Sequence, residues 1–170
     1  MSFSLYDVSV PVFRQYLAGL SGVLTKAEGV GLNEAELMGF RLYEDMQPFT
    51  FQVMQSIGHS AGAVATLRGE SYPRAQGLET LAACKAAVDA GVAYLDGVTA
   101  ADISVDPDAD VSLQTPRGPM VFTARNYLLT FAYGNFFFHV TTAYDILRLK
   151  GVPVGKRDFL GAAQIKSRPG

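Results

Sequence analysis

The sequence has few cysteines and few charged residues, and both shortages limit what the protein can be. Its 170 residues include a single cysteine, Cys84. One cysteine excludes an internal disulfide and fits a reducing cytoplasm. Charged residues make up only 18% of the chain and the net charge is −2. Because no cluster of Lys and Arg alternates with aromatic residues, the composition gives no reason to expect a nucleic-acid partner.

The N-terminus and the longest uncharged segment do not predict a membrane protein. The opening MSFSLYDVSVPVF has no basic region followed by an apolar one, as a signal peptide would, so we expect a cytoplasmic protein. No charged residue occurs from Asn126 to Tyr144. Asn, Thr and His side chains interrupt this segment, however, and such groups are costly in hydrocarbon. We therefore interpret it as a helix buried inside the protein.

Apolar residues recur at intervals of three and four, which predicts four long helices. They are expected over residues 10–29, 48–69, 81–97 and 123–150. Pro48 suits a first helical turn, Thr123 can cap the fourth helix, and Gly151 can end it. Gly134 is predicted to be a kink or a packing point in the fourth helix. A short helical turn and a loop are expected over residues 33–45, and residues 152–170 are expected to form a strap that frays at its end.

A small β-hairpin is predicted before the last helix. Apolar and polar residues alternate around Val111 and Leu113 and again around Met120 and Phe122, and the segment TPRG between them is typical of a turn. Amphipathic helices must pack against one another to leave water, and 170 residues are most economically one domain. The sequence therefore predicts an all-α four-helix bundle with a hairpin insertion, formed by residues 1–170 as a single domain.

The only two histidines lie in the two predicted helices that carry almost no charge. Helices without a charged face are expected to be covered on most sides, so their polar residues matter. These residues form one stripe on each helix, with Gln52, Gln55, Ser56 and His59 on the second and Asn135, His139 and Thr142 on the fourth. If the stripes face each other, they form a pocket whose nitrogen and oxygen donors suit a divalent transition metal.

Other interpretations of these residues stay open. Buried His, Gln and Asn side chains can bond one another and the backbone, which would set the register of the bundle without any ligand. The stripe that ends at His59 could also be a partly exposed surface. Cys84 is interpreted as a core residue. Among the three residues Phe136, Phe137 and Phe138, we expect mostly core packing, with one ring reaching a second subunit.

Several motifs resemble a known family. The opening M-S-x-S-x-Y-x-x-S-V-P-V-F, the segment M-x-P-F-x-x-Q-V-x-x-x-x-x-H ending at His59, and the blocks N-F-F-F-H-V-T-T-A-Y-x-I-L-R and G-K-R-D-F-L-G carry this resemblance over nearly the whole chain. They resemble an uncharacterised bacterial family of domains of unknown function, grouped with the DinB/YfiT-like metalloenzymes.

The resemblance implies a DinB-like bundle with up-down-down-up topology, often a homodimer. In the wider superfamily it implies a metal held by three histidines, one on the second helix and two in an HxxxH pair on the last. His59 matches the first of these and His139 the second member of the pair, whereas Asn135 occupies the remaining position. A neutral amide oxygen is a poorer zinc ligand than an imidazole.

These observations lead to two hypotheses. The first is a DinB-like homodimer with a degenerate site for one divalent transition metal (zinc, nickel or manganese) or a small-molecule ligand. Its predicted metal ligands are His59, Asn135 and His139, and its predicted pocket residues are Gln52, Gln55 and Thr142. The second is a non-catalytic binding or assembly protein, with a structural polar network and no metal. No residue pattern identifies a substrate.

Overall fold

The protein is mostly helical with one small two-stranded sheet, as the sequence predicted. The structure, a computed structural model, describes residues 3–166. Residues 1–2 lie outside that range, and so do residues 167–170 at the end of the predicted C-terminal strap. The long helices are α1 (Val10–Glu28), α3 (Phe49–Gly58), α5 (Leu81–Asp96) and α7 (Tyr133–Leu149). The shorter elements are α2 (Glu34–Gly39), α4 (Ala61–Leu67), η1 (Ala100–Asp102), α6 (Ala124–Asn126), η2 (Tyr127–Ala132) and α8 (Lys156–Leu160).

Helix ends lie where the capping residues allow them. The hydroxyl of Thr80 accepts a hydrogen bond from the backbone N–H of Ala83 at the start of α5. Thr123 does the same for Asn126 at the start of α6, which confirms the predicted cap. After α7 the chain turns at Gly151, whose φ of +89° is a conformation that glycine adopts at low cost.

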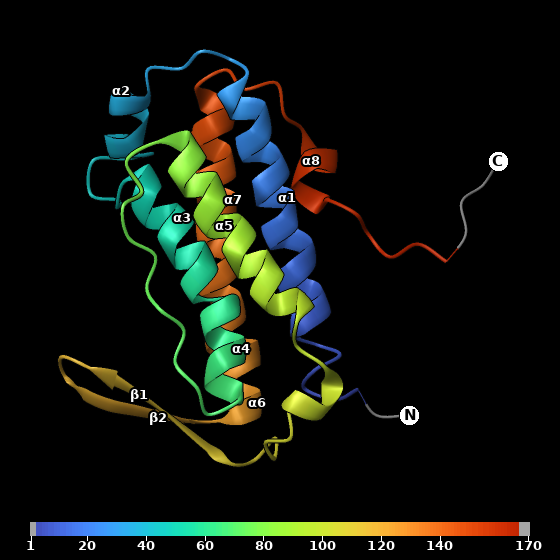
Figure 1. Cartoon of the computed structure of the whole chain (residues 1–170). Coiled ribbons are helices and arrows are strands. Elements are labelled where there is room, and N and C mark those ends of the chain that lie inside the picture. The colour runs from blue at the N-terminus through green and yellow to red at the C-terminus, as the bar shows by residue number, and fades with distance from the viewer. Residues whose placement is uncertain (1–2, 167–170) are drawn as a thin grey trace.

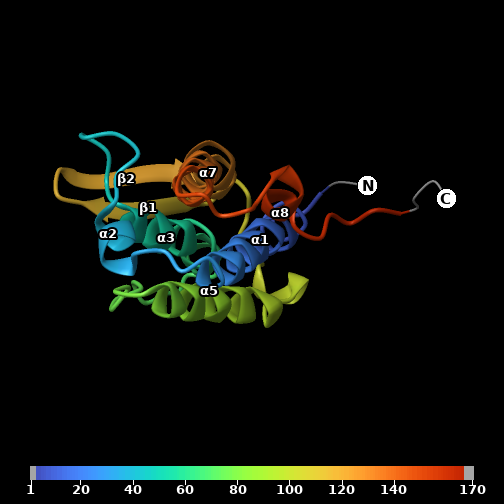
Figure 2. The same cartoon turned by 90° about the horizontal axis from the view of Figure 1, so that it is seen from above.

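The four long helices lie side by side along one axis (Figure 1). Viewed from above, α1 and α3 lie between α5 and α7 (Figure 2). Helix α1 packs on α5 and α8, and α3 packs on α7. The core consists of fully buried apolar side chains, the largest of which are Phe13, Leu17, Leu24, Leu37, Phe49, Ile57, Leu81, Leu95, Leu128, Phe136, Ile146 and Leu147. Burying such side chains is the main favourable contribution to folding, and it positions α3 against α7.

The predicted second helix is broken, which corrects the expectation of one helix over residues 48–69. Helix α3 ends at Gly58, and α4 begins at Ala61. His59 and Ser60 lie between them, and Ser60 has φ −115° and ψ −81°. The hydroxyls of Ser56 and Ser60 donate to the carbonyls of Gln52 and Ser56, and serine bonds of this kind bend helices. His59 is therefore held at a helix end.

The predicted fourth helix is also irregular. Its first part is the short α6 followed by η2, a stretch of π-helix, before α7 begins at Tyr133. Gly134 is not the packing point that the sequence suggested, because a Cβ atom added there would have no neighbour within 4 Å. The irregularity instead precedes Gly134, in a segment whose side chains Tyr127 and Phe131 pack against each other as nearly stacked rings. Single π-helical turns are frequent at functional sites.

The predicted hairpin is present. Strand β1 (Asp110–Thr115) pairs antiparallel with β2 (Gly118–Thr123), and Val111 lies opposite Phe122. Pro116 and Arg117 form the two-residue connection. The hairpin extends from one end of the helices (Figure 1). The inner face of β1 is held to the core through Val111, which is buried.

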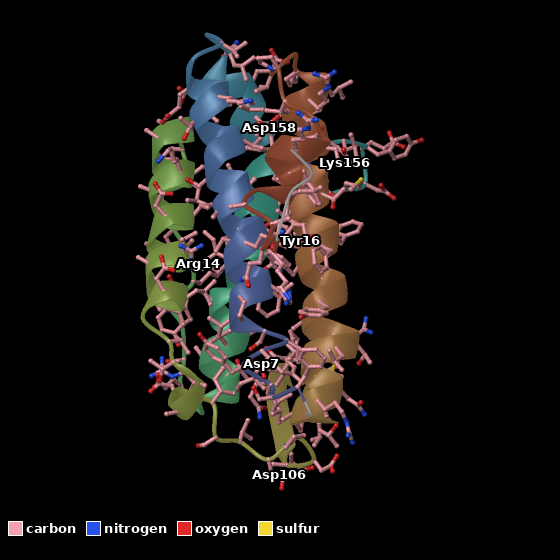
Figure 3. All side chains as sticks on the ribbon, turned by 90° about the vertical axis from the view of Figure 1, so that its right-hand side faces the viewer. Asp7, Arg14, Tyr16, Asp106, Lys156 and Asp158 are labelled. Atoms are coloured by element: carbon pink, nitrogen blue, oxygen red, sulfur yellow. The ribbon has the colours of Figure 1, made fainter. Side chains whose placement is uncertain are left out.

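The C-terminal segment lies along α1. Residues 156–158, part of the predicted C-terminal strap, begin the short helix α8, and Asp158 accepts an ion-pair hydrogen bond from Lys26 of α1 at 2.7 Å. Tyr16 lies between α1 and α7 (Figure 3), and its ring packs against those of Phe137 and Phe159. Within residues 3–166, no helix has the length and hydropathy to cross a membrane.

Candidate functional site

The two histidines lie next to each other between α3 and α7. The ring centroids of His59 and His139 are 5.8 Å apart, and the ring planes differ by only 8°. His59 is at the C-terminal end of α3, and His139 is in the middle of α7. Phe131 packs edge-on against His59, and Phe51 packs edge-on against His139. Packing of α3 on α7 thus brings together two imidazoles that are 80 positions apart in the sequence.

Gln52 determines which ring nitrogen of His139 carries the proton. The Gln52 side chain is buried, and its amide N–H donates to the carbonyl of Gln47 at 2.8 Å. The amide oxygen therefore faces His139, where it lies 2.8 Å from Nδ1. Because an amide oxygen can only accept, Nδ1 must carry the hydrogen and Nε2 must keep its lone pair. A metal-binding histidine is usually oriented by a second hydrogen bond of this kind.

Both histidines are neutral at pH 7. Burial lowers the pKa of His59. The pKa of His139 is lowered to about 4, mainly by burial and to a smaller extent by the neighbouring His59. Removing an imidazolium from water is unfavourable, and a second cation beside it would be more so. The pair therefore presents unprotonated nitrogens, which are the form that binds a metal or accepts a hydrogen bond from a ligand.

Two of the predicted site residues bond to their own helix. The amide of Asn135 donates to the carbonyl of Phe131 at 2.8 Å, at the end of the π-helical stretch. The hydroxyl of Thr142 donates to the carbonyl of Phe138 at 2.7 Å. Asn135 shares a helix face with His139, one turn away, and keeps its amide oxygen for another partner. Thr142 is buried, and its hydrogen is used within α7.

Gln55 and His59 both line a cavity of about 380 Å³. Sequence reasoning missed most of the residues that line this cavity. They come from the segment after α4, from β1 and from η2, and include Glu70, Tyr72, Arg74, Leu113, Tyr127 and Phe131. Residues 70–75 have neither periodicity nor a motif, so the sequence carried no sign that they lie over a histidine. The only sign in the sequence that another segment covers His59 was the absence of charged residues from the predicted second helix.

The donor set fits a transition metal in part. Two neutral imidazoles are good ligands for zinc or nickel. Within residues 3–166, no group of three or more His, Cys, Asp or Glu side chains could hold a metal ion together. Catalytic zinc sites normally use three protein ligands. The described side chains therefore offer two imidazole ligands, and any further ligand would have to be an amide oxygen, water or a small molecule.

Comparisons with known proteins agree with this architecture. The family model described as "Domain of unknown function (DUF1993)" matches residues 5–160. The crystal structure of a DinB family member protein from Shewanella denitrificans is similar to this chain, with a TM-score of 0.84 and 31% sequence identity. That alignment covers 96% of each chain. No curated protein matches the sequence.

Proposed function

The chain belongs to the DUF1993 family of domains of unknown function, and on this basis we propose that it is a DinB-like protein with a reduced metal and small-ligand site. His59 and His139 would hold one divalent transition metal ion, namely zinc, nickel or manganese, next to the cavity that begins at His59. The observation that carries the proposal is the bond from His139 Nδ1 to Gln52, which leaves Nε2 free to bind.

Each residue has a distinct part in this proposal. Gln52 orients His139 and sets its tautomer, while burial keeps both rings neutral. His59 is placed by the end of α3 so that it faces both His139 and the cavity. The oxygen of Asn135 is the third candidate ligand. A bound metal ion would act as a Lewis acid or lower the pKa of bound water or of a thiol.

Metal titration of protein purified without a histidine tag tests this proposal. We expect one ion per chain for zinc, nickel or manganese, and a higher melting temperature when the ion is present, because it binds only the native state. His59→Ala and His139→Ala should each weaken metal binding at least about tenfold. Removing a residue that only orients a metal ligand already costs about tenfold in affinity, so removing a ligand itself should cost at least as much. Thr142→Val is the matched control and should bind as wild type. Failure of all three ions to bind would contradict the proposal.

A second candidate is a non-catalytic assembly protein whose histidines are structural. Its support is that the His139, Gln52 and Gln47 groups already satisfy one another, and that apolar side chains are exposed along η2 and α7. Among these, Leu129 is 46% exposed, Phe138 54% and Leu149 63%. Such a surface is suited to a second copy of the chain. A protein that is purified without metal, does not bind added ions and forms a stable dimer would favour this candidate.

We also infer the connectivity of an up-down-down-up four-helix bundle. The course of the chain in Figure 1 supports it, because α1 and α7 rise while α3 and α5 descend. The long segment between α4 and α5 returns the chain to the other end, as two successive parallel helices require. This segment is also the one that passes over His59.

A further inference from the structure

The cavity beside His59 has the dimensions of a small-molecule site. Its volume is about 380 Å³, and ligand sites commonly range from about 300 to about 1,000 Å³. It is lined by residues of α3 and α4, by residues 70–75, by Leu113 of β1 and by η2. Elements that are distant in the sequence thus form its walls, and His59 is one of them.

One wall of the cavity is aromatic. Phe131 lies 5.7 Å from the His59 ring, centroid to centroid, and 6.1 Å from the ring of Tyr127. Tyr72 faces them from the segment after α4 and packs edge-on against Tyr94. Rings held in place by one another present a rigid apolar surface, which suits the body of an aromatic or aliphatic molecule.

The charges around the cavity are not balanced. Glu70 is paired with Arg68 at 3.0 Å, so its carboxylate already has a partner. Arg74 also lines the cavity, but within residues 3–166 its guanidinium has no carboxylate partner, and its Nε contacts only the sulfur of Met54, at 2.9 Å. Arg74 lies between this cavity and a neighbouring one of about 320 Å³. A guanidinium in this position is suited to binding a carboxylate through two parallel hydrogen bonds.

We propose that the cavity binds a small organic carboxylate with an apolar or aromatic body. The carboxylate pairs with Arg74, the body lies against Phe131 and Tyr127, and the end nearest α3 meets His59. The inference rests on the proposed function in one respect, since it takes the His59 site to be a site for a ligand. It specifies the charge and shape of that ligand, and it does not require a bound metal.

Gly62 offers a way to narrow the cavity without disturbing the fold. It lines the cavity from α4, and a Cβ atom added there would meet only the Cβ of Tyr72, at 3.9 Å, an ordinary contact. A larger side chain at this position therefore extends into the cavity. In a helix, replacing glycine also favours the helical conformation. Gly62→Leu should consequently fold and leave less room for a ligand.

Calorimetric titration with 3-phenylpropionate and with its neutral amide, 3-phenylpropanamide, tests the proposal on the full chain. Wild-type protein should bind the acid about two- to fivefold more tightly than the amide, a preference of the size that one exposed ion pair provides. Arg74→Gln should lose this preference and bind the amide as wild type does. Gly62→Leu should bind both compounds more weakly than wild type, and its melting curve shows whether it is folded.

Several results would overturn the inference: no binding of either compound, equal binding of the two, or a preference that survives in Arg74→Gln. Nickel titration of the same proteins separates this inference from the proposed metal site. Arg74→Gln should bind nickel as wild type does, because Arg74 is not a ligand. Nickel binding without acid binding would refute the carboxylate site alone, whereas acid binding without nickel binding would refute the metal site alone.

Discussion

Replacing Gln52 by leucine should destabilise the protein because the buried ring N–H of His139 loses its hydrogen-bond partner. The Gln52 side chain is 1% exposed and joins His139 Nδ1 to the carbonyl of Gln47, both at 2.8 Å. Leucine has a similar size but can make neither bond. His139 is only 8% exposed, so its ring N–H would stay buried without a partner. The exposed Gln47 can recover a bond to water.

The expected loss is about 2 kcal/mol in the free energy of unfolding, within the range of about 1–3 kcal/mol for a buried polar group left without a partner. For a chain of this length, that corresponds to a melting temperature about 4–8 °C lower. Thermal unfolding followed by circular dichroism measures it. Gln55→Leu is the matched control on the same helix: its side chain makes no hydrogen bond within residues 3–166, so the change should stay within about 0.5 kcal/mol.

A double-mutant cycle shows whether the loss comes from this bond. Gln52→Leu and His139→Leu remove the two partners separately and together. If the bond exists, the combined loss differs from the sum of the single losses by about 0.5–3 kcal/mol, as for other directly interacting pairs. Additive losses, or a Gln52→Leu variant as stable as wild type, would refute the reasoning.

Three further predictions concern pH, helix contact and assembly. The pKa of His139 is lowered from 6.5 to about 4, so between these pH values the unfolded chain binds more protons than the folded protein. Lowering the pH from 7 to 4 should therefore reduce the free energy of unfolding by up to about 3 kcal/mol. The His139→Gln variant should not show this loss. Gly19→Ala should lower the melting temperature, because its Cβ would lie 2.8 Å from the carbonyl oxygen of Phe159, whereas Gly22→Ala, with no neighbour within 4 Å, should leave it equal or raise it. If the exposed α7 surface joins two copies, sedimentation equilibrium should give a dimer for wild type and a monomer for Phe138→Lys, and a dimeric variant would place the contact elsewhere.

Much of the helical fold could be predicted because it follows from local patterns. Apolar spacing identified the helices, Thr123 and Gly151 marked two of their ends, and alternation identified the hairpin. The breaks could not be predicted in the same way. The interruption at His59 depends on serine hydroxyls that bond to backbone carbonyls, and the π-helical stretch near Phe131 adds no signal to the apolar pattern.

The approach of the two histidines was predictable from the sequence, but most of the cavity lining and the contacts around the rings were not. The absence of charge around His59 and His139 indicated that the two helices are covered, and the structure brings their rings to 5.8 Å. That Gln52 bonds to His139 depends on how α3 packs on α7. The position of Arg74 beside His59 depends on the path of an irregular segment, for which the sequence carries no pattern.

The most direct test of the account is the protonation state of the two rings. Long-range proton–nitrogen NMR of protein labelled with ¹⁵N-histidine separates protonated from unprotonated ring nitrogens. At pH 7, His139 should be neutral with its proton on Nδ1, and added zinc should shift the signals of His139 Nε2 and of a His59 nitrogen. A proton on Nε2, a charged ring, or spectra unchanged by zinc would contradict the claim that Gln52 prepares His139 to bind.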